Sequence, residues 1–180
     1  RRARVAVRTG TRRRDIPPMT VKDQAPPRLD VTLDIATSPD TVFQAFFQDG
    51  ALAAWHGTSR SIAVPRLLGP YVLEWPTAAE RDEMLGRLGG VFRATVMHIE
   101  PNDHVFLADA YWLPPDGAPL GPFAVECTFT PAAAADGRRS TVVRVVMTGF
   151  DEGVRWRRYH GIATAQWQRA LRVLKMLLEK

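Results

Sequence analysis

The sequence predicts an α+β fold in which a curved antiparallel β-sheet wraps around one long C-terminal α-helix. Three observations lead to this prediction. A strand pattern is followed by two short helical segments, the middle of the chain reads as consecutive strands separated by turns, and an amphipathic helix of about two dozen residues closes the chain. A lone helix of that length has to cover an apolar surface, and the sheet offers the only large one.

The first strand is expected at residues 29–36. Apolar residues at the odd positions alternate with polar residues at the even positions from Leu29 to Ile35. This period of two is typical of a strand with one buried face.

Two short helices are expected after this strand. Ser38 fits a helix N-cap and Pro39 fits the first helical position. The apolar residues that follow recur at helical spacing, namely Val42, Phe43, Phe46 and Phe47. The second helix is expected at residues 51–55, and Gly57 ends it.

The middle of the chain carries strand patterns bounded by turn residues. Residues 76–85 are polar and favour helix, and we interpret them as a long hairpin connection. The strongest turn signal lies at residues 114–117, a Pro-Pro-Asp-Gly run. The strands are expected at residues 61–64, 71–75, 89–100, 104–112, 123–130 and 141–148.

The long helix is expected at residues 154–179. Its basic residues occupy much of one side, and its apolar stripe has steps of three and four residues. The stripe consists of His160, Ala163, Trp167, Leu171, Leu174 and Leu178.

The basic charge is concentrated in the first residues of the chain. The net charge is +5, and seven arginines lie in the first fourteen residues. From Met19 onward the net charge is close to −1, which argues against a specific nucleic-acid partner. We therefore divide the chain into an Arg- and Pro-rich leader at residues 1–28 and a folded domain at residues 29–180.

Three origins for residues 1–18 remain open. They are a disordered arm that touches polyanions, an Arg-rich targeting peptide, and an upstream choice of start with Met19 as the biological first residue. The third is favoured, because nothing in this stretch predicts a folded element.

Several classes of function lack their sequence signals. The single cysteine, Cys127, excludes an internal disulfide and cannot form a thiolate metal site by itself. There is no apolar run long enough for a membrane span and no secretory signal, so a cytoplasmic location is expected. Nucleophile-elbow, phosphate-loop and dinucleotide motifs are also missing, so no cofactor, metal or catalytic residue is assigned.

The histidines are candidate site residues. His98 and His104 flank one turn, which could bring them together across a hairpin, although a metal site there is the minor alternative. His98 shares its side of the strand with Phe92 and Val96, so it would be a polar group in an apolar cavity if that side faces inward.

The aromatic residues exceed what one helix–sheet interface needs, and a sheet curved around a helix encloses volume that side chains rarely fill. Such apolar pockets are the usual binding sites for small molecules. The candidate ligand-binding residues are Trp55, Tyr71, Trp75, Phe92, Val96, His98, Phe106, Phe123, Cys127, Tyr159, Ala163 and Trp167.

The order of these elements resembles the helix-grip fold of the START-like (SRPBCC) superfamily, in its branch named after the activator of Hsp90 ATPase. The resemblance covers about residues 29–180 and lies in the order and spacing of motifs rather than in one diagnostic motif. One departure is Trp55 followed by His56, where the family usually has two tryptophans. The passages that carry the resemblance are residues 31–36, 38–46, 52–55, 69–73, 90–105 and 161–178.

The resemblance implies a domain that binds a hydrophobic small molecule, such as a lipid, polyketide or aromatic metabolite, between the sheet and the long helix. One alternative is an enzyme of the cyclase, aromatase or dehydratase kind, with His98 or Tyr111 as acid or base. The other is a chaperone-associated interaction protein, and we rank it last. A non-catalytic role is favoured, and a homodimer remains open.

Overall fold

The core of the fold is a seven-stranded antiparallel sheet, and the computed structural model describes residues 27–133 and 137–180. The expected leader at residues 1–28 lies almost entirely outside the described residues. The strands of this sheet are β1 (Leu29–Ile35), β2 (Arg60–Ala63), β3 (Pro70–Trp75), β6 (Gly90–Glu100), β7 (His104–Leu113), β8 (Leu120–Ala133) and β9 (Arg139–Thr148). Their spatial order is β1-β9-β8-β7-β6-β3-β2, and every neighbouring pair is antiparallel.

Two short helices follow β1, as the sequence predicted. The first is α1 (Pro39–Ala45), and the second is α2 (Asp49–His56). The Ser38 side chain caps α1 by accepting a hydrogen bond from the Thr41 backbone N–H. Gly57 ends α2 with a φ of 73°, a left-handed conformation that glycine adopts without strain.

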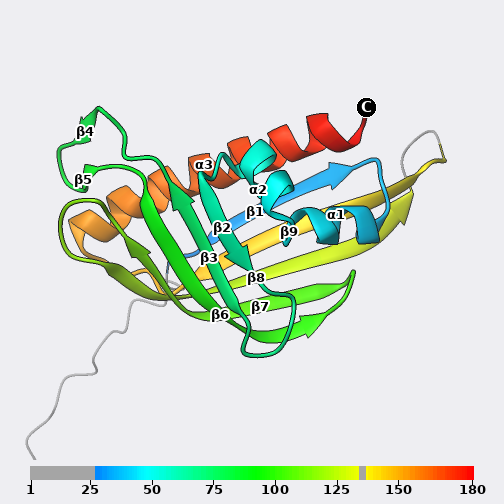
Figure 1. The fold of residues 1–180 in the computed structure, drawn as a ribbon, viewed down its shortest axis with the longest axis horizontal. Coiled ribbons are helices and arrows are strands. Elements are labelled where there is room, and N and C mark those ends of the chain that lie inside the picture. The colour runs from blue at the N-terminus through cyan, green and yellow to red at the C-terminus, as the bar shows by residue number, and fades with distance from the viewer. Residues whose placement is uncertain (1–26, 134–136) are drawn as a thin grey trace, which may run out of the picture.

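The long helix α3 (Val154–Leu178) lies along the inner face of the curved sheet, with α2 beside it (Figure 1). Its buried residues are Tyr159, Ala163, Ala170, Leu171 and Leu174. These residues lie on one side of the helix, which packs against the rest of the fold. This arrangement confirms the predicted helix-grip architecture.

The expected connection after β3 contains a small hairpin of its own, made by β4 (Arg81–Asp82) and β5 (Gly86–Arg87). The Asp82 carboxylate accepts hydrogen bonds from the backbone N–H groups of Met84 and Leu85, which fixes the turn. It also forms an ion pair of 2.7 Å with Arg158 on α3. This side-chain bonding selects a turn over the helix that the local composition favours.

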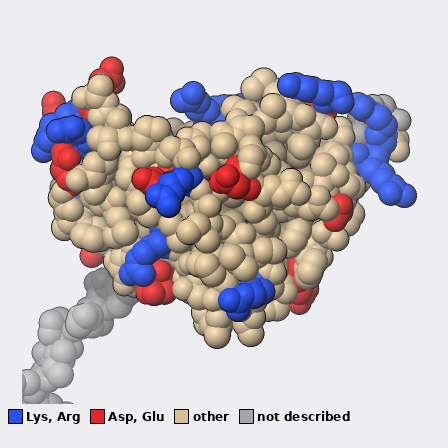
Figure 2. All heavy atoms as spheres, viewed as in Figure 1, with Lys and Arg blue, Asp and Glu red and all other residues tan. Residues whose placement is uncertain are grey.

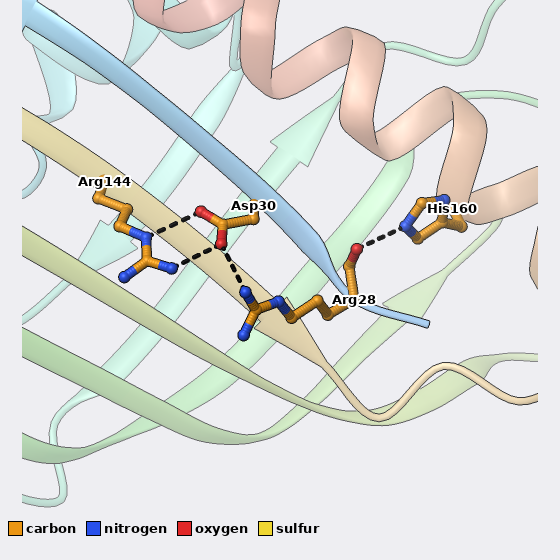
Figure 3. A network of polar contacts seen from close by, with 4 residues as sticks. All are labelled: Arg28, Asp30, Arg144 and His160. Carbon is orange, nitrogen blue, oxygen red and sulfur yellow. Dashed lines mark hydrogen bonds and ion pairs between the residues drawn. The ribbon is translucent and has the colours of Figure 1, made fainter. Parts of the chain in front are cut away.

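A polar network joins the start of β1 to β9 and α3 (Figure 3). Arg144 holds the Asp30 carboxylate with two hydrogen bonds of 2.8 and 2.6 Å, and Arg28 approaches the same carboxylate at 3.2 Å. The Arg144 guanidinium lowers the pKa of Asp30 from its usual value. The Nε2 atom of His160 contacts the Arg28 carbonyl oxygen at 2.9 Å, so α3 is tied to the first strand.

None of the helices in the described residues is long and apolar enough to cross a membrane.

Candidate ligand-binding cavity

A cavity of about 860 Å3 lies between the inner face of the sheet and the helices α2 and α3. Its volume falls in the range of small-molecule sites. Residues from β3, β6, β7 and β8 form its floor, and α3 contributes the opposite wall. Aromatic side chains recur around it, including Phe46, Phe47, Trp112 and Tyr159.

Most of the candidate residues chosen from the sequence lie on this cavity wall. They come from α2, three strands and α3, which the fold brings together from distant parts of the chain. The residues on the wall are Trp55, Tyr71, Trp75, Phe92, Cys127, Tyr159, Ala163 and Trp167.

Two other candidates, His98 and Phe106, do not line the cavity. A register shift between Val96 and His98 in β6 reverses the inward and outward alternation, and His98 becomes exposed. Phe106 is the pairing partner of His98 and is half-buried. The buried neighbours of Phe106, Val105 and Leu107, line the cavity instead.

The last two candidates, Val96 and Phe123, are buried but do not line the cavity. Val96 is 0% exposed and sits where the loop after β2 reaches β6, since its carbonyl oxygen accepts from the Leu68 N–H. Phe123 packs against Phe150 and Trp156 under the first turns of α3. Both residues serve the core rather than the pocket.

His98 and Tyr111, which the enzymatic alternative would use as acid or base, also lie outside the cavity lining. The Arg93 guanidinium lies over the Tyr111 ring at 4.9 Å from its centroid, and neither residue lines the pocket. His98 and His104 do come together, with ring centroids 5.1 Å apart, and each contacts a glutamate. The described residues contain no group of three or more side chains suited to hold a metal ion.

Hydrogen bonds to backbone carbonyls hold several aromatic residues of the wall in place. The Tyr71 hydroxyl donates to the Phe46 carbonyl at 3.1 Å, and burial raises the pKa of this tyrosine. The Trp55 indole donates to the Ala45 carbonyl at 2.9 Å. Because these polar atoms are already bonded, the wall is left with largely apolar ring surface.

Cys127 is a buried thiol on the wall. Burial raises its pKa to about 12, and the neighbouring Glu126 carboxylate adds to this effect. The thiol is therefore protonated at neutral pH and lacks the thiolate that a nucleophile needs.

His56 is a cavity residue that was not chosen from the sequence. It is 8% exposed, and neither ring nitrogen has a hydrogen-bond partner among residues 27–133 and 137–180. Burial lowers the pKa of His56 to about 4, against an opposing effect of its own backbone that does not reach hydrogen-bond geometry, so its ring is neutral at ordinary pH. The sequence did carry a signal, because His56 stands where the family usually has a second tryptophan.

Polar side chains from α3 stand at the edge of the cavity. Gln166 and Arg169 are exposed and belong to its lining. The helix carries six basic residues and no acidic one between Val154 and Leu178. Lysine and arginine side chains gather along the upper edge of Figure 2, where Figure 1 draws the C-terminal half of α3.

Solved structures share this fold at low sequence identity. A protein from Mesorhizobium loti is 22% identical with a TM-score of 0.56, covering 83% of this chain and 96% of its own. The Aha1 dimer from Colwellia psychrerythraea is 16% identical with a TM-score of 0.56, covering 84% of this chain and 96% of its own. A protein from Mycobacterium smegmatis is 14% identical with a TM-score of 0.61, covering 84% of this chain and 90% of its own.

No curated protein matches this chain in sequence. The family model described as activator of Hsp90 ATPase homolog 1-like protein matches residues 36–179, which span α1 through α3 and nearly all of the sheet. This match agrees with the resemblance found in the order of the sequence motifs. The chain therefore belongs to the activator of Hsp90 ATPase homolog 1-like protein family.

Proposed function

We propose that this domain binds a hydrophobic small molecule, such as a lipid, polyketide or aromatic metabolite, in the cavity between the sheet and α3. The observation that carries the proposal is the cavity of about 860 Å3 with aromatic walls whose polar atoms are mostly bonded to backbone. Burying roughly 300 Å2 of apolar ligand surface supplies several kcal/mol at about 25 cal/mol per Å2. Apolar burial alone supplies this binding free energy, so the proposed function requires no catalytic residue.

The enzymatic alternative draws less support from the site. Its two named acid–base residues, His98 and Tyr111, lie outside the cavity lining. The thiol of Cys127 on the wall has a pKa raised to about 12 by burial, which makes it a poor nucleophile. The chaperone-associated role rests on the family name alone and stays the last alternative.

A fluorescent probe tests the proposal. N-phenyl-1-naphthylamine is neutral and brightens in apolar surroundings, so we expect its emission to rise with the protein and to saturate at one site per chain. The variant Ala163→Phe fills the cavity from α3, because Ala163 is 5% exposed and faces the pocket. We expect this variant to stay folded and to lose the probe signal.

A matched control adds the same ring on the surface. Ala53 lies in α2, is exposed and does not line the cavity, so Ala53→Phe should bind the probe as the unmodified chain does. Equal binding by both variants, or no binding by the unmodified chain, would refute the proposal.

Two further expectations accompany the function. A cytoplasmic location fits a single buried thiol, Cys127, which needs no oxidising compartment. A homodimer is named for the Colwellia protein and is an expectation for this chain. Light scattering after size exclusion gives its mass, and a monomer at micromolar concentration would exclude a stable dimer.

A further inference from the structure

His56 is a polar side chain buried in the cavity wall without a partner. It is the last residue of α2, it lines the pocket, and both of its ring nitrogens lack hydrogen bonds within the described chain. Thr58 and Ser140 also carry buried oxygens without partners there, but neither lines the cavity. Buried polar groups in native proteins usually have a partner, so an unpartnered one in the wall of a pocket is a candidate contact for a ligand.

Three tryptophan rings surround the imidazole. The ring centroids of Trp55, Trp75 and Trp167 lie 4.8, 5.2 and 5.0 Å from that of His56. None of these indoles titrates, so the shell around the imidazole supplies no charge. All three tryptophans also line the cavity, so ring surface that is not packed on His56 is available to stack against a flat aromatic guest.

The three indoles differ in how they are held. Trp55 donates to the Ala45 carbonyl at 2.9 Å, and Trp75 donates to the His56 carbonyl at 3.0 Å. Trp167 is half-buried on α3, and no hydrogen bond to a described residue holds its indole. Trp167 is therefore the member of the shell that can rotate at least cost.

The imidazole offers one donor and one acceptor. Burial lowers the pKa of His56 to about 4, so the neutral ring keeps one N–H and one bare nitrogen. A hydroxyl can donate to the bare nitrogen or accept from the N–H. The neutral ring itself offers a ligand carboxylate no positive charge, and the cation of the lining is Arg169 at the edge of the cavity.

We propose that His56 is the polar anchor of the cavity, which hydrogen-bonds the hydroxyl of a planar aromatic ligand after the Trp167 indole turns aside. This inference rests on the proposed binding function and narrows its ligand to a hydroxylated aromatic molecule. The ligand's ring lies among the tryptophans, and its hydroxyl meets the nitrogen that has no partner in the chain.

A matched pair of probes tests the anchor. 2-Naphthol and 2-methylnaphthalene have the same ring system and nearly the same shape, and they differ in one hydroxyl. Displacement of N-phenyl-1-naphthylamine gives the two dissociation constants. We expect the unmodified chain to prefer 2-naphthol by about tenfold or more, since a site with an unpaired polar group discriminates against the analogue that lacks the hydroxyl. In His56→Phe this preference should vanish or reverse.

The control variant is Thr58→Val, which removes a buried unpartnered hydroxyl close in sequence but outside the cavity. It should leave the preference unchanged. If His56→Phe keeps the tenfold preference, the anchor is refuted and the binding function stands. If neither naphthalene nor the fluorescent probe binds the unmodified chain, both the function and the anchor fail.

Nitrogen-15 spectra of the unmodified chain give a test that needs no substitution. 2-Naphthol should shift the His56 ring nitrogen signals and the Trp167 indole signal, and 2-methylnaphthalene should leave the His56 nitrogens in place. The hydrogen-bonded Trp55 indole should move little with either compound. Equal His56 shifts with both probes, or His56 nitrogens already bonded to a buried water that 2-naphthol does not displace, would overturn the proposal.

Discussion

The indole N–H of Trp75 donates a hydrogen bond of 3.0 Å to the backbone carbonyl of His56. This contact joins the last residue of β3 to the last residue of α2. It satisfies a carbonyl at a helix C-terminus and also sets the Trp75 ring 5.2 Å from the imidazole. One side chain thus fixes both the end of a helix and the position of a cavity wall.

Replacement of Trp75 by Phe should destabilise the fold. The variant loses the hydrogen bond to His56, worth about 1 kcal/mol, and part of a large ring, for a total of roughly 2 kcal/mol. Urea denaturation measures the loss. Trp156→Phe is the control, because Trp156 is also half-buried and no hydrogen bond to a described residue holds its indole. Equal losses in the two variants would show that the Trp75 hydrogen bond contributes nothing.

The stability of the domain should fall as the pH drops from about 6.5 to about 4. Burial lowers the pKa of His56 from 6.5 to about 4, so the unfolded chain binds this proton more readily than the folded one. The contribution of neutral His56 to the free energy of unfolding is complete above pH 6.5, the pKa in the unfolded chain. It is lost as the pH falls toward 4, the pKa in the folded chain. The loss is at most about 3 kcal/mol.

The variant His56→Phe isolates this effect. Its free energy of unfolding, measured by urea titration at several pH values, should change less between pH 6.5 and 4 than that of the unmodified chain. Asp30 and Asp82 have pKa values lowered by Arg144 and Arg158, and their contributions are lost below about 4 in both proteins. Parallel curves for the two proteins would contradict a buried neutral His56.

The architecture could be predicted because its signals are local. Alternation at residues 29–35, the Ser38 cap and the stripe on the last helix each follow from a period or a capping rule that one segment carries by itself. The order of these segments then leaves few ways to bury their apolar faces.

The residues of the cavity wall were harder to predict. They depend on which side chains of each strand point inward, and a β-bulge changes that alternation partway along the strand. The alternation in β7 shifts between Leu107 and Ala110, where Asp109 has a φ of 50°. The shift in β6 after Val96 turned His98 outward in the same manner. Bulges of this kind depend on pairing with neighbouring strands, and that information is absent from the segment itself. His56 was missed because its lack of a partner is a property of the packed fold.

Substitution of Gly90 should cost much more than substitution of Gly57. Both have positive φ, 83° and 73°, which disfavours alanine by about 1 kcal/mol. A Cβ at Gly90 would also overlap the Leu113 carbonyl oxygen, whereas nothing lies within 4 Å of a Cβ at Gly57. We expect Gly90→Ala to lose roughly 3 kcal/mol or more and Gly57→Ala about 1 kcal/mol. Thermal denaturation of the pair compares them, and similar midpoints would contradict the close approach of β6 to β7 at this site.

The reactivity of Cys127 should report how the cavity opens. The thiol is 2% exposed, lies on the cavity wall and has a pKa raised to about 12 by burial. The chain has one cysteine, so the whole reaction with a thiol reagent can be assigned to Cys127. In mildly alkaline buffer we expect the large anionic reagent 5,5′-dithiobis(2-nitrobenzoate) to react about a hundredfold more slowly with the native chain than with the unfolded chain.

A small neutral reagent distinguishes access through the cavity from unfolding. Methyl methanethiolsulfonate is small enough to enter the pocket, so it should modify native Cys127 faster than the large reagent does. N-phenyl-1-naphthylamine should slow the reaction with the small reagent, because it occupies the pocket. Ala53→Cys in a Cys127→Ala background places the thiol on exposed α2 and should react rapidly with both reagents, with or without the probe. If both reagents modify native Cys127 at the same slow rate, unfolding governs access and the thiol is sealed from the cavity.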